Sequence, residues 1–429
     1  MSETYDVAVV GAGLAGMSAA VFAANRGLRV AQVGNAGALL FSSGLLDLLA
    51  VHPVEEGRTW NDPWAGFAAL SRGLPQHPYA KLEAARVRAA FIELITAFDE
   101  AGLAYTAPGE SNHELLTGVG TLKSTYCLPC SMQAGVAALG ACSPCLLVDF
   151  EGLREYSAKA LAAGVAARWP GLRTLRLAFP APGIAGEVYA AHIALALEER
   201  VARERLADLV RPHLGDARAV GLPAVLGIIR SARAAAHLTE ALGVPVFEVP
   251  TMPTSVPGLR LKNALERAVA ARGVERRVHG RVVAVEHSRD GFGLSVAATP
   301  SPARLRARAV ILATGRFMGR GLEASRTRVR EPLLDLYVRQ PAARSDWHQA
   351  DLFDARGHAL NRAGLEVDDG FRACDARGGV VHPRLFTVGS ILAHHDWVRM
   401  KCGAGLAIGT AAAAVARLTG ELGLAGGPS

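Results

Sequence analysis

The chain has 429 residues, of which half are hydrophobic and 20% are charged, so it can bury a large core and is not intrinsically disordered. Its net charge is +7, but only five of its 46 basic residues are lysines and no run of five like charges occurs. The arginine excess fits the composition of a GC-rich genome, and we expect no nucleic-acid partner. The length predicts two or more domains, or one elaborated α/β enzyme.

Three long uncharged stretches, at residues 7–25, 30–46 and 124–148, resemble membrane spans only in their length. Glycines interrupt the first, polar residues the second, and prolines and cysteines the third, so none has the continuous apolar character of a spanning helix. No basic segment precedes an apolar one at the N-terminus, as it does in a secretory signal. We expect a cytoplasmic protein without a direct membrane span, whose association with the inner membrane, if any, runs through a partner.

A strand–helix–strand unit is predicted at the start of the chain. Tyr5–Val10 is a short apolar, β-branched run, which is typical of a strand buried on both faces. A glycine motif follows at once and opens a helix pattern over Leu14–Asn25, and a second strand is predicted over Leu28–Val33. This order and spacing favour a nucleotide-binding βαβ unit over an incidental glycine turn.

Each glycine of the motif has a predicted role. Gly11 permits the tight turn, Gly13 lets the backbone approach a pyrophosphate, and Gly16 lets helix and strand pack closely. The helix N-terminus supplies partial positive charge to the phosphates. An acidic residue that binds an adenosine ribose is expected at the end of the second strand, but Gly34 stands there, followed by Asn35. The adenosine half of a dinucleotide therefore has less support than its pyrophosphate.

Four cysteines form a CxxC…CxxC array in the middle of the chain, at Cys127, Cys130, Cys142 and Cys145. Four thiolates at this spacing are candidate ligands for zinc or an iron–sulfur cluster. The apolar stretch 131–141 between the pairs lacks the polar residues of zinc ribbons, so buried or loop cysteines are an equal alternative. Redox-active pairs are a third interpretation.

Two further strands ending in glycine are predicted in the last third of the chain. Ala309–Leu312 is a buried strand followed by Thr314 and Gly315, and Leu385–Val388 is another, followed by Gly389 and Ser390. A helix rich in alanine then opens at Cys402, Gly403 and Gly405 and runs to about Leu418. Its N-terminus would point at the flavin N1 and C2 carbonyl and stabilise the reduced ring. Together these elements predict an α/β, Rossmann-like two-dinucleotide-domain flavoprotein fold with an inserted cap or substrate domain.

Four segments of the chain resemble the B subunit of bacterial anaerobic glycerol-3-phosphate dehydrogenase. They are Phe41–Leu49, Val220–Gly227, Phe247–Leu261 and Leu312–Phe317. The first segment adds Ser42, Ser43 and Gly44 to the predicted flavin site. The loop Ala393–Lys401 is richer in histidine and cations than the version typical of that family, and the cysteine array is not general to it.

The resemblance implies a flavoprotein subunit that oxidises sn-glycerol 3-phosphate to dihydroxyacetone phosphate. It implies FMN as the cofactor, an FAD-bearing A subunit as the catalytic partner, and a membrane-associated iron–sulfur C subunit that passes electrons toward the quinone pool. Gly34 in place of the ribose-binding acid fits FMN better than FAD, because FMN lacks the adenosine. FAD remains the alternative.

Hydride removal from such a substrate needs a base for the hydroxyl and cations for the phosphate. His395 is the candidate base, Arg399 and Lys401 are candidate phosphate ligands, and Arg316 is placed to reach the flavin ring. For each of the four, an ordinary solvated or hydrogen-bonded side chain is the alternative. If the A subunit performs the hydride chemistry, these cations instead dock a partner or tune the flavin.

We predict a flavin-binding domain in two parts, at residues 1–75 and 301–429, and a cap or substrate domain over residues 76–300. The inserted part contains a rigid Pro250–Pro257 loop and an amphipathic helix over Leu259–Ala270. Two alternatives to the dehydrogenase subunit stay open. One is a stand-alone FAD-dependent oxidoreductase of the fumarate reductase or ketosteroid dehydrogenase type, and the other is a non-catalytic assembly subunit with a degenerate flavin site.

Overall fold

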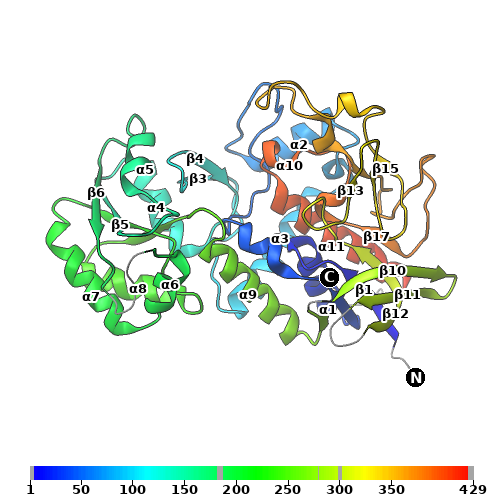
Figure 1. Ribbon diagram of the computed structural model, residues 1–429, viewed down its shortest axis with the longest axis horizontal. Helices are drawn as coiled ribbons and strands as arrows, with labels where there is room; N and C mark the ends of the chain where they lie inside the picture. The colour runs from blue at the N-terminus through cyan, green and yellow to red at the C-terminus, as the bar shows by residue number, and fades with distance from the viewer. Residues whose placement is uncertain (1–3, 181–186, 279, 298–301, 424–429) are drawn as a thin grey trace. The chain divides into compact units, whose positions relative to one another are not determined.

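Figure 1 shows a computed structural model of the chain, which describes residues 4–180, 187–278, 280–297 and 302–423. The chain divides into two units, each compact by itself. The first unit comprises residues 1–38, 47–97 and 265–429, and the second comprises residues 39–46 and 98–264. The domain limits expected from the sequence lie at 75/76 and at 300/301, and the latter falls outside the described residues. The assignment of the inserted part as a cap stays a prediction.

The first unit is built on a seven-stranded sheet of order β10-β11-β12-β1-β2-β9, with β17 paired to the end of β12. Its strands are β1 (Thr4–Val10), β2 (Val30–Val33), β9 (Glu275–Arg277), β10 (Arg281–Ser288), β11 (Gly291–Ala297), β12 (Ala303–Leu312) and β17 (Leu385–Thr387). Strands β9, β2, β1, β12 and β17 pair in parallel, and β10 and β11 form an antiparallel hairpin beside the first half of β12. The carboxyl ends of the parallel strands therefore lie along one edge.

Helices α1 (Leu14–Asn25) and α11 (Gly403–Glu421) pack against each other in this unit. Both carry many buried alanines and glycines, so the two backbones can approach closely. Strand β1 lies inside the sheet between β12 and β2, and its last four residues are buried on both faces, which matches their apolar character. The helix predicted over Leu14–Asn25 is confirmed residue for residue, whereas the second strand begins two residues later than predicted, at Val30.

The second unit has its own parallel sheet of order β6-β5-β7-β8 and a separate β3–β4 hairpin. Its strands are β3 (His113–Leu116), β4 (Leu122–Thr125), β5 (Cys145–Phe150), β6 (Leu172–Leu177), β7 (Ala219–Pro223) and β8 (Val246–Val249). Its helices are α4 (Cys130–Gly140), α5 (Ala158–Gly164), α6 (Ala190–Ala196), α7 (Arg200–Val210) and α8 (Ser231–Leu242). Strands β5, β7 and β8 are buried throughout, as expected for parallel strands covered by helices.

Several shorter or connecting elements complete the chain. The helices are α2 (Pro63–Gly73), α3 (Ala84–Glu100), α9 (Val256–Ala271) and α10 (Trp397–Met400), and the two-residue strands are β13 (Glu323–Ala324), β14 (Val329–Arg330), β15 (Val338–Arg339) and β16 (Gly364–Leu365). The 3-10 turns are Ala36–Phe41, Pro78–Lys81, Arg211–His213, Arg344–Asp346, Ala359–Arg362 and Gly389–Ile391. No helix in the described part of the chain is long and apolar enough to cross a bilayer.

The C-terminal elements also follow the sequence-based expectation. Strand β12 contains the predicted Ala309–Leu312 run but starts at Ala303, because its first half pairs with β11. Helix α11 begins at Gly403, as predicted, and continues to Glu421. Helix α9 contains the predicted amphipathic segment and begins within the proline-rich stretch, at Val256.

Candidate functional site

The candidate site lies where the parallel strands β1, β12 and β17 end together. The amide of Ala313 donates to the carbonyl of Val10 at 2.8 Å, and the amide of Val388 donates to the carbonyl of Leu312 at 3.0 Å. Each of the three strand ends leads into a turn that holds one of the predicted glycines. In open α/β sheets, ligands bind in the crevice outside the carboxyl ends of such strands.

In the turn after β1, the backbone is closely packed at Gly11 and Gly16 and has open space beside it at Gly13. Gly11 has φ +124, and a Cβ there would lie 2.2 Å from the carbonyl oxygen of Ala313. A Cβ on Gly16 would lie 2.2 Å from the carbonyl oxygen of Gly11, whereas a Cβ on Gly13 would meet no heavy atom within 4 Å. Gly11 and Gly16 thus serve backbone packing, and space remains over Gly13. This is the arrangement that the approach of a pyrophosphate requires.

The same turn presents the N-terminus of α1. Gly13 is the N-cap residue, and no side chain caps the helix. The first N–H groups of a helix have no intrahelical acceptor, so they are available to an anion. Open space and uncapped donors coincide at Gly13, and these residues fit the phosphate groups of a flavin cofactor.

Gly34 explains why no ribose-binding acid follows β2. It has φ +153, and a Cβ there would lie 3.0 Å from the nitrogen of Ala12 and 3.1 Å from the carbonyl carbon of Gly11. A larger residue would press against the phosphate-binding turn. The neighbouring Asn35 is exposed, and its Oδ1 accepts the N–H of Gly37 at 2.9 Å. The missing acid is therefore a consequence of packing at this position.

The turns after β12 and β17 adjoin the first turn. A Cβ on Gly389 would lie 2.6 Å from the Cβ of Ala15, and the Gly389 amide donates to Oγ1 of Thr410 at 2.9 Å. The position of a Cβ on Gly315 is 3.7 Å from Oγ of Ser390. The buried Oγ1 of Thr314 has no hydrogen-bond partner among the described residues. The predicted residues of both turns are thus brought together, with a polar atom left for a ligand.

Helix α11 begins beside the same unit's Tyr79. The Tyr79 hydroxyl donates to the carbonyl of Leu48 at 2.6 Å and lies 3.2 Å from the carbonyl of Cys402. Gly405 leaves no room for a side chain, because a Cβ there would be 2.2 Å from the Tyr79 hydroxyl oxygen. No side chain caps α11, so its N-terminus can face a ligand. Burial raises the pKa of the Cys402 thiol, which is therefore inert.

Ser42, Ser43 and Gly44 belong to the second unit. The amide of Gly44 donates to Oγ of Ser42 at 3.0 Å, and the carbonyl of Gly44 accepts the hydroxyl of Tyr105 at 2.6 Å. The hydroxyl of Ser255 donates to the carbonyl of Ser42 at 2.5 Å. The segment is thus fixed against the start of α9 within its own unit, and its contact with a flavin stays a prediction.

His395 is fully buried beside a second histidine. Its ring centroid lies 6.3 Å from that of His77, edge to face, and neither nitrogen of His395 forms a hydrogen bond of regular geometry within the described residues. Burial, with the Arg316 guanidinium as a smaller cause, lowers the pKa of His395 to about 3, against the nearby carbonyls of Leu392 and Ser390. The imidazole is neutral near pH 7, but so low a pKa makes it a weak base.

His77 and Tyr79 are parts of this site for which the sequence carries no motif. The Nδ1 of His77 accepts the amide of Tyr79 at 3.0 Å, while its Nε2 is buried without a partner among the described residues. Burial, followed by His395, lowers the pKa of His77 well below its ordinary value. Two neutral histidines thus lie side by side in the first unit.

Arg316 belongs to a hydrogen-bonded network that includes Asn361 and Asp396. The Arg316 guanidinium donates to the carbonyls of Asn361 and Leu360 at 2.5 and 2.6 Å. The Asn361 side chain donates to Asp396 at 3.1 Å. Burial lowers the pKa of Arg316, and Asp396 opposes this shift. Arg316 is therefore held in place by its own surroundings, with its charge balanced in part by a carboxylate.

Arg399 lies in the short helix α10, and Lys401 follows its last residue. Arg399 donates from Nη2 to the carbonyl of Ala355 at 2.8 Å, and its buried Nη1 has no partner in the described residues. Lys401 ends α10 in the left-handed conformation, with φ +52, immediately before Cys402. The structure places both cations next to the start of α11 in sequence and space.

The four cysteines of the array do not form a cluster. All are free thiols, with Cys127 and Cys145 buried and Cys130 and Cys142 exposed. Helix α4 separates the two pairs, and its 11 residues correspond to roughly 16 Å. In the described ranges, no group of three or more His, Cys, Asp or Glu side chains is placed to hold a metal ion. This geometry does not support the zinc or iron–sulfur interpretation.

Burial also acts against metal binding by the inner pair. It raises the pKa of Cys127 to about 12 and that of Cys145 to about 11, so both remain protonated thiols near pH 7. The exposed Cys142 instead contacts Arg168, whose Nη1 lies 3.3 Å from its sulfur. The array is best described as two core cysteines and two surface cysteines, which was the alternative left open by the sequence.

Comparison with known proteins adds three findings. A family model described as "FAD binding domain" matches residues 6–406. The chain is 29% identical to the B subunit of anaerobic glycerol-3-phosphate dehydrogenase from Vibrio vulnificus strain YJ016, over 97% of this chain and 96% of that one. It is 32% identical to the probable B subunit of the same enzyme from Halobacterium salinarum strain R1, over 96% of this chain and 97% of that one.

Among solved structures, the chain is similar to 3-ketosteroid Δ1-dehydrogenase from Sterolibacterium denitrificans. The TM-score is 0.43 at 12% identity, with 97% of this chain and 100% of that chain covered. Glycine oxidase from Geobacillus kaustophilus is similar with a TM-score of 0.32 at 14% identity, with 97% and 95% covered.

Proposed function

Because the chain belongs to the family of anaerobic glycerol-3-phosphate dehydrogenase B subunits and carries an FAD-binding domain, we propose that it is a flavin-bearing subunit that oxidises sn-glycerol 3-phosphate to dihydroxyacetone phosphate. The observation that carries this proposal is the convergence of three glycine turns at the carboxyl edge of β1, β12 and β17. The fold is that of a Rossmann-like α/β flavoprotein, and the family is that of flavin-dependent oxidoreductases. Both were expected from the sequence.

We favour FAD as the cofactor, in place of the FMN implied by the resemblance. The matched family model describes FAD binding, and Gly34 is accounted for by packing against Ala12 without reference to the adenosine. Bound flavin supplies the acceptor for the hydride that leaves C2 of the substrate. The chain's own part is to hold the phosphates at Gly13 and to place the uncapped α11 N-terminus toward the ring.

Arg316, Arg399 and Lys401 are the residues we propose for the substrate phosphate. Arg399 supports this role because its buried Nη1 has no acceptor within the described chain. His395 suits an uncharged, positioning role better than that of a base, because its pKa is lowered to about 3. The segment 42–44 stays a proposed part of the flavin site, and the inserted region stays a proposed cap or substrate domain.

The lowered pKa of His395 favours a second candidate function, because so weak a base is poorly suited to take a proton from the substrate. The chain would then transfer electrons through its flavin, while an FAD-bearing A subunit removes the hydride and an iron–sulfur C subunit at the inner membrane passes electrons toward the quinone pool. The relatives are named as B subunits, which supports a multi-subunit assembly of this kind. The chain itself would be cytoplasmic and reach the membrane through its partners.

Anaerobic reduction distinguishes the two candidates. The purified chain, loaded with flavin, is mixed with sn-glycerol 3-phosphate and flavin bleaching is followed by absorbance, with glycerol as the control lacking a phosphate. Bleaching of the isolated chain supports the dehydrogenase, whereas bleaching only after addition of the partner subunits supports the electron-transfer role. A chain that neither retains nor takes up flavin would contradict both and leave the assembly role.

A further inference from the structure

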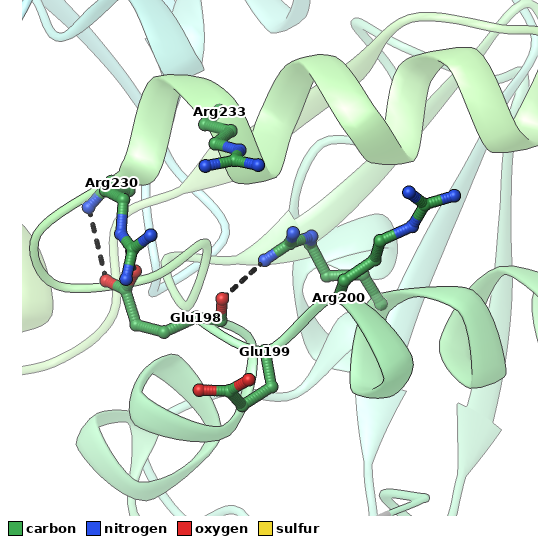
Figure 2. Close-up of a pocket in the computed structure, with 6 residues that line it drawn as sticks. Glu198, Glu199, Arg200, Arg230 and Arg233 are labelled. Carbon is green, nitrogen blue, oxygen red and sulfur yellow. Dashed lines mark hydrogen bonds and ion pairs between the residues drawn. The ribbon is translucent and has the colours of Figure 1, made fainter.

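The second unit contains a pocket that the proposed function does not use. It lies where α7 and α8 begin, has a volume of about 190 Å³, and is shown in Figure 2. Its lining is almost entirely charged and consists of Glu198, Glu199, Arg200, Arg203, Arg230 and Arg233. Four guanidinium groups thus face two carboxylates in one small space.

One of the two carboxylates is already satisfied by the protein. Oε1 of Glu198 accepts the backbone N–H groups of Ile228, Ile229 and Arg230 at 2.6, 2.6 and 3.2 Å, and Oε2 lies 3.6 Å from Nε of Arg230. Burial alone would raise the pKa of Glu198, but these N–H groups and Arg230 outweigh it and lower the pKa. Glu198 therefore fixes the loop before α8, and its charge offsets the charge of Arg203 only in part, because burial and Arg233 outweigh it.

Arg203 is the central cation of the pocket. Only 5% of the residue is exposed, and its Nη1 donates to the carbonyls of Leu197 and Glu198 at 2.7 and 2.8 Å. Its buried Nε has no acceptor among the described residues. Burial and then the positive charge of Arg233 lower the pKa of Arg203, so the two guanidinium groups lie close enough to repel each other. An unsatisfied, buried and crowded guanidinium needs an anion.

Two helix N-termini add donors to the same place. Helix α7 begins at Arg200 after Glu199, and α8 begins at Ser231 after Arg230, in both cases without a side-chain cap. Figure 2 shows the Arg230 and Arg233 side chains descending from the start of α8 toward the Glu198–Glu199 backbone, with Arg200 on the other side. Helix N-termini favour negative charge through their free N–H groups and dipoles.

We propose that this pocket binds a phosphate group, either free phosphate or the phosphomonoester of a small metabolite, at a site of its own in the second unit. A tetrahedral dianion offers acceptor oxygens to donors that arrive from both helices, whereas a planar carboxylate satisfies one guanidinium fork. Arg200 contributes less, because it pairs with Glu204 at 2.7 Å. The Glu199 carboxylate lies in the lining and opposes the anion, so the cations Arg203 and Arg233 supply the decisive attraction.

Isothermal titration of the whole flavin-loaded protein tests the proposal at fixed ionic strength, with inorganic phosphate and sn-glycerol 3-phosphate as separate probes. The variant is Arg233→Gln, because Arg233 is exposed at the pocket and its removal leaves the core intact. The control is Arg205→Gln, which removes the same charge from a position of α7 outside the lining. We expect phosphate affinity to fall about tenfold or more in Arg233→Gln and to stay unchanged in Arg205→Gln.

The two probes identify the source of the phosphate. If sn-glycerol 3-phosphate binds more tightly than inorganic phosphate and both affinities fall in Arg233→Gln, the occupant is a phosphomonoester; equal affinities that fall together indicate free phosphate. Equal binding by wild type and Arg233→Gln, or no binding of either probe by wild type, would overturn the proposal. Flavin content and flavin bleaching, measured on the same samples, report on the proposed function independently.

Discussion

The guanidinium of Arg260 and the carboxylate of Glu248 form a bidentate ion pair inside the second unit, with Nη1–Oε2 and Nη2–Oε1 distances of 2.6 and 2.8 Å. Both residues are buried, with exposures of 2%. Ser131 and the amide of Leu226 each donate to Glu248 at 2.6 Å, and Nε of Arg260 donates to the carbonyl of Gly227 at 2.7 Å. The pair therefore joins the segments Val220–Gly227 and Phe247–Leu261, which carry the family resemblance.

Removal of one partner should destabilise the protein strongly. Glu248→Gln leaves the Arg260 charge buried and uncompensated, and we expect a loss of about 3–5 kcal/mol in the free energy of unfolding measured with urea. The control Asp208→Asn breaks the exposed pair with Arg211 and should cost less than about 1 kcal/mol. Comparable losses in the two variants would show that the buried pair contributes no more than a surface pair.

The same pair gives stability a defined pH dependence. Burial would raise the pKa of Glu248, but Arg260, Ser131 and Leu226 outweigh it and hold the pKa below its ordinary value. A carboxylate with a depressed pKa stabilises the folded state above its unfolded pKa and loses that contribution as the pH falls through its folded pKa. The difference between wild type and Glu248→Gln should therefore be largest near neutral pH and shrink in acid. A constant difference down to strongly acidic pH would contradict this.

Replacement of Gly13 should abolish flavin binding and change the free energy of unfolding only slightly. Gly13→Val places its Cβ where no heavy atom lies within 4 Å, and valine is a poorer N-cap residue than glycine, so we expect the unfolding free energy of the flavin-free protein to fall by no more than about 1 kcal/mol. The side chain would occupy the space for the flavin phosphates, and the absorbance of bound flavin should disappear. Gly109→Val is the matched control, since its Cβ also faces open space, and it should retain flavin. Full flavin binding by Gly13→Val would place the phosphates elsewhere.

His395 and His77 should make the protein sensitive to mild acid. Burial lowers the pKa of His395 to about 3 and that of His77 well below its ordinary value. Below about pH 6.5 the unfolded chain binds protons that the folded state excludes, so stability is complete above that pH and decreases as the pH falls. The contribution of His395 is lost by about 1.4 kcal/mol per pH unit between about pH 6.5 and 3. His395→Gln should reduce the slope of unfolding free energy against pH by that amount. An unchanged slope would show that the pKa of His395 is not lowered in the folded protein.

The cysteines should differ in reactivity and bind no structural metal. Cys130 and Cys142 are exposed, whereas burial raises the pKa of Cys127 to about 12 and that of Cys145 to about 11. A thiol reagent at pH 8 should modify the exposed pair rapidly and reach the buried pair only after unfolding. Zinc and iron in anaerobically purified protein should be far below one atom per chain. Stoichiometric metal that is lost in Cys127→Ser would contradict the structure's separation of the pairs.

The glycine turns and their secondary structure could be predicted because the information is local. The apolar run before Gly11 and the helix pattern over Leu14–Asn25 define β1 and α1 within about 20 residues. The role of Gly34 could not be predicted in the same way. Its close contact with the backbone of Gly11 and Ala12 excludes a side chain, and only the assembled sheet brings these positions together.

Long-range packing explains the remaining differences. The spacing of the cysteines suggests one cluster, but the stretch between them forms α4 and keeps the pairs apart. Arg203 and Arg233 are 30 positions apart in sequence, and they line the same pocket because the N-termini of α7 and α8 lie close together. His77 lies far from His395 in sequence, and no pattern around it indicates that the two rings are neighbours.

The most direct test of the central claim is the identification of the flavin. The purified wild-type chain, reconstituted with equal amounts of FAD and FMN, is separated from free flavin and denatured, and the released flavin is identified by chromatography. We predict about one FAD per chain, held by the glycine turns at Gly11–Gly16, Gly315 and Gly389. Release of FMN alone would correct the identity of the cofactor, and a colourless chain that takes up neither flavin would contradict the account.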